Sequence, residues 1–428
     1  MRLASTKTAA ALCGGLLLAM SVPASAAVDA KLLDMLKANG SINNAQYAEL
    51  QAELTRDQHA QQIQQQATAE QMTAMQAKRN ELSAFEQKVA WAAKTQIKGD
   101  VRMRYEDVNS DGNASDQGRE RVRARIGVYS EINPQVDAGV RIASGSNDDR
   151  RSTNQSLDNY FTKKQLWLDQ AYLDWHPTDV KDLHLIVGKM NQPWVNEGDI
   201  IWDSDINPEG LAATYKLPLG SGGAELFGSA GYYILKDNVD GDGVQFNHDL
   251  NMYAGQLGAR FAPTDGMKVT LGGSIYSFDG DDSPAARAAL AINGNTSTQF
   301  RLYEGFGQID LSNLPIPLSA YGQYVVNDRA ATDEDTAWLL GVKTKLGKFG
   351  LDYNYRDVQR DAVVGAFTDS DFANGFTGSR GHKFKVGYEI DKNFSVAAAY
   401  LMATSDTAAP NRNDADIDTL QVDLEAKF

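Results

Sequence analysis

A strict two-residue alternation of apolar and charged side chains constrains this chain more than any other feature. In its last ten residues, Thr419–Phe428, the positions Leu, Val, Leu, Ala and Phe alternate with Thr, Gln, Asp, Glu and Lys. Successive side chains of a β-strand point to opposite faces, so this strand has one apolar face and one charged face. Strands of a soluble sandwich rarely combine a fully apolar face with a face of consecutive charged residues. An apolar face toward lipid and a wet face toward a lumen account for the pattern, which predicts a transmembrane β-barrel.

The same alternation recurs at the start of this region. In residues 95–106, Val101, Met103 and Tyr105 share one face, whereas Arg102 and Arg104 share the other. We predict an antiparallel barrel of sixteen strands, near residues 95–107, 119–132, 135–145, 165–176, 182–190, 209–217, 223–236, 250–262, 266–278, 299–312, 316–328, 335–346, 348–358, 381–391, 393–404 and 415–428. Short and long connections alternate, as periplasmic turns and external loops do. An even number of strands places both ends of the barrel on the periplasmic side.

The first 26 residues are predicted to be an export signal. Arg2 and Lys7 precede an apolar stretch that is too short to span a bilayer, and Ala24-Ser25-Ala26 supplies a cleavage site after Ala26. The only cysteine, Cys13, lies inside this segment without the neighbours that lipidation requires. We therefore expect a mature chain that contains no disulfide and no reactive thiol.

Residues 27–93 are predicted to form a helical periplasmic segment. Residues 28–92 are rich in Ala, Gln, Glu and Lys and contain no proline. A short helix is expected over Lys31–Lys37, and a longer one is expected from Asn43 or Asn44 to about Ala93. Apolar residues recur along the longer helix at helical spacing, although its centre is polar. We interpret it as a weak coiled coil; the alternative is a solvated helix without partners.

Charge and hydropathy exclude other classes of protein. The chain has 56 acidic and 41 basic residues, and removal of Arg2 and Lys7 with the predicted signal leaves a net charge of −17. This balance argues against a nucleic-acid partner. Outside the signal there is no apolar run of helix-spanning length, which argues against a helical membrane protein.

Two stretches of sequence resemble a known family. One runs from Gly188 to Trp194 (Gly-Lys-Met-Asn-Gln-Pro-Trp) and on through 201–205 (Ile-Trp-Asp-Ser-Asp) to 208–210 (Pro-Glu-Gly), and the other is the last strand, which ends on Phe428. On these residues the chain resembles the putative-porin family with an N-terminal coiled coil, and its layout is similar to phosphate-selective porins. The resemblance implies a sixteen-stranded trimeric pore, surrounded by lipid in the outer membrane of a Gram-negative bacterium. Phe428 is similar to the terminal signal that the barrel-assembly machinery binds.

The resemblance also implies a loop that folds into the barrel and narrows it. The candidate is the long connection 191–208, with Trp194, Ile200, Ile201 and Trp202 as apolar anchors. Its acidic residues are Glu197, Asp199, Asp203 and Asp205. These side chains are the predicted negative side of a constriction.

The predicted positive side is a basic wall on the inward faces of the early strands. It comprises Arg102, Arg104, Arg121, Arg123, Arg125 and Arg141. Guanidinium groups stay charged in water, so an acidic loop opposite them would set a transverse field that favours polar solutes. Alternatively, the arginines pair with nearby acids such as Asp100, Glu106 and Glu120 and only make the wall rigid. A second inward basic group, Lys343, Lys345, Arg356, Lys383 and Lys385, would favour anions if it joined the first.

The first external connection contains half of a calcium-loop pattern. Asp107, Asn109 and Asp111 stand at alternate positions before Gly112, but Gly118 replaces the glutamate that usually completes the site. A solvated turn is therefore favoured over a calcium site.

No catalytic set or cofactor motif is evident. The five histidines are scattered and have no serine partner on a shared strand face. We expect a porin that allows passive diffusion of small hydrophilic solutes and ions and that has no enzymatic activity or cofactor. The alternatives are an anion-selective channel of the phosphate type, an envelope-tethering structural barrel, and a barrel phospholipase or protease.

Overall fold

A computed structural model describes residues 30–111, 117–146, 149–220, 222–237, 249–279, 288, 290–408 and 414–428. The predicted export signal, residues 1–26, lies outside the described residues. The chain divides into two units, Met1–Ala90 and Trp91–Phe428, which are described separately here.

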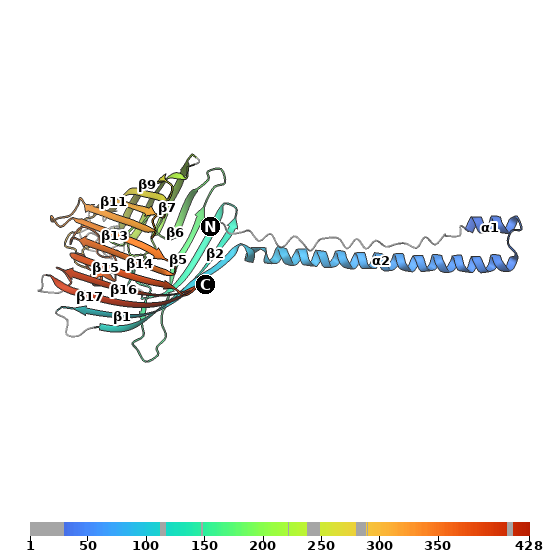
Figure 1. Ribbon diagram of the computed structural model, residues 1–428, viewed down its shortest axis with the longest axis horizontal. Coiled ribbons are helices and arrows are strands. Elements are labelled where there is room, and N and C mark those ends of the chain that lie inside the picture. Colours follow the sequence, from blue (N-terminus) through green and yellow to red (C-terminus); the bar gives the residue numbers. More distant parts are fainter. Residues whose placement is uncertain are drawn as a thin grey trace. The chain divides into compact units, whose positions relative to one another are not determined.

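The first unit is helical, with α1 over Ala30–Ala38 and α2 beginning at Asn44 and ending at Ala93 (Figure 1). Asn43 caps α2: its side-chain oxygen accepts from the backbone N–H of Gln46 at 2.9 Å, and Gln46 accepts from the backbone N–H of Asn43 at 3.1 Å. This reciprocal pair satisfies two N–H groups at the end of the helix. Tyr47 donates to Asp34 and lies under the Lys37 ammonium, so the start of α2 packs against α1. None of the described helices combines the length and apolar character needed to cross a membrane.

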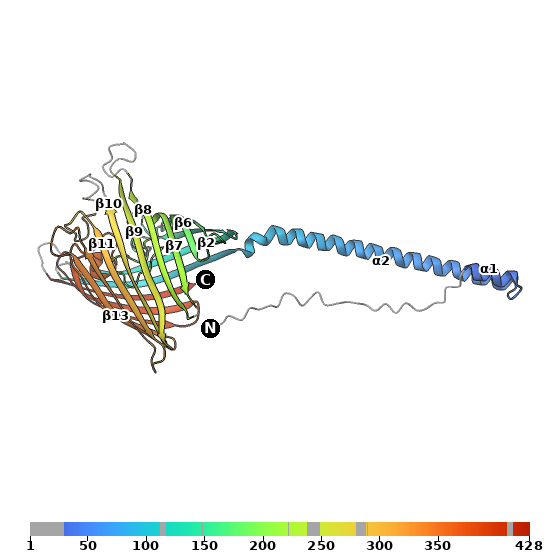
Figure 2. The same cartoon turned by 90° about the horizontal axis from the view of Figure 1, so that it is seen from above.

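The second unit is a closed antiparallel barrel whose wall has sixteen strands (Figures 1 and 2). They are β1 (Thr95–Ser110), β2 (Gln117–Asn133), β3 (Val136–Ser144), β5 (Leu166–Trp175), β6 (Leu183–Lys189), β7 (Glu209–Leu219), β8 (Ala224–Lys236), β9 (Leu250–Thr264), β10 (Met267–Asp279), β11 (Arg301–Leu311), β12 (Leu318–Asn327), β13 (Thr336–Leu346), β14 (Phe349–Val358), β15 (Ser379–Glu389), β16 (Phe394–Ser405) and β17 (Ala415–Lys427). The sixteen predicted strands are confirmed, with ends that shift by a few residues. The two-residue β4 (Gln155–Ser156), which pairs with β2, was not predicted.

The barrel closes where β17 pairs with β1, side by side in Figure 1. The terminal Phe428 and Gly99 exchange two backbone hydrogen bonds of 3.0 Å, just beyond the end of β17. The Phe428 ring covers Gly99, and a Cβ at position 99 would lie 2.5 Å from the ring. Glycine is therefore required at position 99, and the terminal residue completes the seam that removes the last open edge.

Burial follows the predicted two-residue period. On β17, Leu420, Val422 and Leu424 are 38–43% exposed on the outer face, whereas Thr419 and Gln421 on the inner face are only 2–3% exposed. The polar inner face is thus the buried one, the reverse of a soluble sandwich and the arrangement that a lipid-facing barrel requires.

The main apolar cluster of the barrel lies inside the lumen rather than within the wall. It joins inward side chains of β8 to β14, such as Tyr233, Tyr276 and Leu339, to residues of the connections after β6, β10 and β14. Long connections therefore fold inward and pack against the inner wall.

Candidate pore constriction

The first inward loop, residues 190–208, connects β6 to β7 and carries the predicted anchors. Ile200, Ile201 and Trp202 are each no more than 2% exposed. The Trp202 ring lies 4.9 Å from the ring of Trp194 and 5.2 Å from that of Tyr276 on β10. Burial of each such side chain contributes roughly 1.5–3 kcal/mol, so these anchors hold the loop firmly inside the barrel.

The base of this loop depends on a close backbone approach. Gly188 on β6 has φ +117°, and a Cβ there would lie 2.2 Å from the carbonyl oxygen of Ala171. The loop is closed by a 2.9 Å hydrogen bond from the N–H of Met190 to the carbonyl oxygen of Pro208. The Gly-Lys-Met segment thus turns the chain from the wall into the lumen.

A second inward loop, residues 359–378 between β14 and β15, was not predicted to enter the barrel. It runs beside the first loop: the N–H of Asp203 donates to Phe367 at 2.7 Å, and the N–H of Asp369 donates to Asp199 at 3.0 Å. The Phe367 ring also lies 5.4 Å from the ring of Trp202. The run Ala-Val-Val-Gly-Ala-Phe at 362–367 is the sequence signal that could have revealed it, because a solvated external loop has no need of six successive apolar or small residues.

Arg151 fixes the second inward loop from a third connection, the one between β3 and β4. Its guanidinium donates to the carbonyl oxygens of Gly365 and Gly375, each at 2.9 Å. One side chain thus ties two turns of the second inward loop together.

A four-residue charge cluster attaches both inward loops to the wall. Asp199 of the first loop lies 2.7 Å from both Arg356 on β14 and Lys383 on β15. Asp369 of the second loop contacts the same cations at 3.1 and 2.9 Å. Burial favours the neutral form of Asp199, but Arg356 and Lys383 outweigh it and hold the pKa of Asp199 well below its usual range. Two cations thus bind two carboxylates, one from each loop.

The predicted basic wall faces the lumen, and acids of the neighbouring strands pair with much of it. Arg123 lies 2.8 Å from Asp100 and 2.6 Å from Glu425, and Arg121 approaches Glu106 at 3.4 Å. The Arg141 guanidinium donates to Asp169 on β5. Glu120, which was also considered as a partner, pairs in register with Tyr105 on the outer face.

Two arginines of the wall contact acids of the inward loops instead. Arg125 lies 3.2 Å from Asp205 of the first loop and 2.7 Å from Asp100. Arg104 lies 3.1 Å from Asp371 of the second loop and 2.7 Å from Asp423 on β17. The acids therefore do not all face the early arginines, since Asp199 pairs with the later group on β14 and β15.

Arg102 differs from the other five arginines. It donates one hydrogen bond of 2.7 Å to Asn154 and lies 3.7 Å from Asp423, which also pairs with Arg104. Its buried Nε atom, like that of Arg121, has no hydrogen-bond partner within the described residues. Arg102 therefore has the weakest ion pairing of the basic wall.

The remaining loop acids have distinct environments. Asp203 accepts from the N–H groups of Asp205 and Ser370, and burial, together with the charges of Asp369 and Asp205, raises its pKa well above the usual range. Burial also raises the pKa of Glu197, which the Lys343 charge partly offsets. Both carboxyl groups therefore take up a proton at higher pH than an ordinary carboxyl group does.

Between the loops and the wall lies a cavity of about 200 Å³, far above the roughly 10–15 Å³ that one water requires. We call it the constriction cavity. Its charged lining comes from β1, β2, β15, β17, residue 151 and both inward loops. Ala397 and Ala399 of β16 line it with small side chains. A second cavity of about 270 Å³ adjoins it and shares Asp199, Lys383 and Lys385 with it.

The calcium hypothesis does not fit the local backbone. Asp107 and Asn109 belong to the extended strand β1, which continues to Ser110, so they do not curl around a common point. Residues 112–116 of the pattern lie outside the described residues. Within the described residues, no group of three or more His, Cys, Asp or Glu side chains is arranged to hold a metal ion.

Comparisons with known proteins agree with this architecture. A family model described as putative porin matches residues 109–304 and 325–428. Phosphate starvation-inducible protein 1 of Pseudomonas fluorescens is 73% identical over 37 residues, which are 9% of this chain and 95% of that relative. The structure of Pseudomonas putida OprB at high pH shares the fold, with a TM-score of 0.53 and 12% identity over 81% of this chain and 97% of that one. A mutant of Rh. blastica porin covers 78% of this chain and all of its own, with a TM-score of 0.43 and 12% identity.

Proposed function

Because the chain belongs to the putative porin family and forms an outer-membrane channel for small hydrophilic solutes, we propose that its two inward loops together set the size limit of the channel. The observation that carries this proposal is the contact between the loops. Asp203 and Asp369 bond the two backbones together, and Arg356 and Lys383 bind both loops to the wall. Because the loops are bonded both to each other and to the barrel wall, they remain in the lumen while solutes pass.

We infer that solutes pass along β16. Ala397 and Ala399 leave space where every neighbouring strand contributes a long polar side chain to the cavity. A solute crossing there meets both arginines of β1 and β2 and acids of the two loops. Fixed opposite charges in a narrow aqueous path favour small polar solutes over apolar ones.

The test is the conductance of the purified protein in planar bilayers, together with liposome swelling in sugars of increasing size. A trimeric porin gives current steps in groups of three and a sharp size limit. Purified, folded protein that yields no current steps would refute the channel.

A second candidate function is a channel that prefers anions, and it is favoured by the inward cations on β13 and β15. The name of the 37-residue relative refers to phosphate starvation, which fits this candidate without naming a solute. The reversal potential under a salt gradient tests it, since a cation-preferring pore would remove it.

The helical unit fits a trimeric coiled coil in the periplasm. Met75, Leu82, Phe85 and Val89 follow the spacing of core positions in a heptad, and Tyr47, Leu50 and Leu54 keep the same phase. Met75, Leu82 and Phe85 are 58–72% exposed, so a second and third copy of α2 would bury them. The helix has 50 residues and is about 75 Å long, so three copies would form an extended stalk.

The mature protein then begins after Ala26, and the barrel-assembly machinery binds its terminal strand at Phe428. Deletion of residues 27–92 separates a channel from an envelope-tethering barrel. A channel conducts without these residues, whereas a barrel that only tethers the envelope conducts neither with them nor without them.

A further inference from the structure

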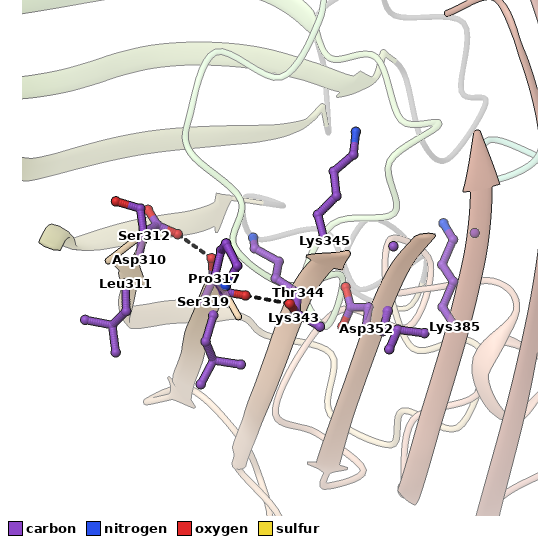
Figure 3. A pocket seen from close by; sticks show the side chains of 14 residues that line it. Asp310, Leu311, Ser312, Pro317, Ser319, Lys343, Thr344, Lys345, Asp352 and Lys385 are labelled. Carbon is purple, nitrogen blue, oxygen red and sulfur yellow. Dashed lines mark hydrogen bonds between the residues drawn. The ribbon is translucent and has the colours of Figure 1, made fainter. Parts of the chain in front are cut away.

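Lys385 on β15 is the one lysine that lines all three of the cavities along the β13–β15 wall. It borders the constriction cavity, the adjoining cavity of about 270 Å³, and a vestibule of about 500 Å³ near the turn between β13 and β14. In the vestibule, Lys345 and Lys385 extend to the opposite side of the sheet from Leu311 (Figure 3). Since Leu311 lies on the lipid-facing side, both lysines point into the lumen.

Lys385 also differs from its neighbours in its pairing. Lys383, two residues away on the same face, binds Asp199 and Asp369, and Lys345 on β13 binds Glu389 at 2.6 Å. Within the part of the chain that the structure describes, no ion pair joins Lys385 to an acid, and its side chain is exposed. An exposed, unpaired ammonium keeps its full charge for a passing ion.

Arg102 lines the constriction cavity with Lys385 and is the weakly paired member of the basic wall. The other cations of the cavity are engaged: Arg104 and Arg123 with acids, Arg151 with carbonyl oxygens, and Lys383 with both loops. Six carboxylates and six cations line the cavity, and Lys385 is the lining cation that has neither an ion pair nor a hydrogen bond among the described residues.

We propose that Lys385, with Arg102 in the same cavity, forms the anion-selecting site of the pore and takes small hydrated anions such as chloride. This inference rests on the proposed channel function and adds the class of permeant ion and the residue that selects it. An anion entering the vestibule meets Lys385, which also borders the constriction cavity where Arg102 lies.

The test compares reversal potentials under a KCl gradient for the wild-type protein and the variants Lys385→Gln and Lys385→Glu. One unit charge about 5 Å from the path in water changes the local concentration of each monovalent ion about fourfold, in opposite directions for anion and cation, so the anion-to-cation permeability ratio changes roughly 15-fold. We expect an anion-preferring wild type, a drop of about 15-fold in this ratio for Lys385→Gln, and a drop of about two orders of magnitude for Lys385→Glu. The matched control is Lys181→Glu, which changes an exposed lysine between β5 and β6 that lines none of the three cavities and leaves the ratio within twofold.

Chemical modification of a cysteine at position 385 changes the charge after the barrel has already folded and assembled. The only cysteine lies in the predicted signal, so Lys385→Cys introduces a unique thiol into the mature chain. After reconstitution, a negatively charged thiosulfonate reagent should lower anion preference, and a positively charged one should restore it.

Loss of the channel and loss of the selecting site give different results. A wild-type protein without current steps refutes the channel itself. Conducting channels whose reversal potential is unchanged in Lys385→Glu, or after modification of Lys385→Cys, refute the selecting role of Lys385 and leave the channel intact.

Discussion

Trp202 is the residue whose loss should widen the pore most, because it joins both inward loops to the wall. Its ring is 2% exposed and lies 4.9–6.4 Å from the rings of Trp194, Tyr276, Phe278 and Phe367. Truncation of a buried tryptophan to alanine costs about 3–5 kcal/mol. If that free energy is lost from loop docking, the ratio of docked to undocked loops falls roughly 10²- to 5 × 10³-fold.

The assay for Trp202→Ala is single-channel conductance combined with the size limit for sugars in liposome swelling. We expect higher conductance, more current noise and passage of larger sugars. Trp175→Ala is the matched control, since Trp175 lies on β5 and is 43% exposed. If Trp202→Ala folds and shows the conductance and size limit of the wild type, the loops do not form the constriction.

Three further predictions follow from the same geometry. Asp199→Asn should shift the reversal potential toward anions, because Arg356 and Lys383 then share one carboxylate; an unchanged potential would place the cluster away from the ion path. Acidification should increase anion preference, since Asp203, with its raised pKa, takes up a proton as the pH falls while Asp199 stays ionised; Asp203→Asn should remove most of this pH dependence in reversal potentials. Phe428→Ser should lower the yield of folded barrel in the outer membrane several-fold, measured by the heat-modifiable mobility of the protein on gels, and a normal yield would contradict its place at the seam.

The candidate site was predicted from the sequence only in part. The anchors Ile200, Ile201 and Trp202 were identified because apolar side chains in a long connection need an apolar surface to cover them. The partners of the loop acids could not be identified from the sequence, because Asp199 pairs with Arg356 and Lys383, which lie on strands more than 150 residues away in the chain. Which cations share a level in the lumen depends on the stagger of the strands, and alternation alone does not contain that stagger.

Phe428 shows the division between what the sequence determined and what the tertiary structure decided. Alternation along 419–428 placed this residue on the lipid face of the last of sixteen strands, because side-chain direction is a local property of extended backbone. Its pairing with Gly99 was decided only by closure of the sheet, which joins residues from opposite ends of the barrel. The position of the second inward loop and the unpaired charge of Lys385 were also decided only by the tertiary structure, because both depend on which distant side chains the closed barrel brings together.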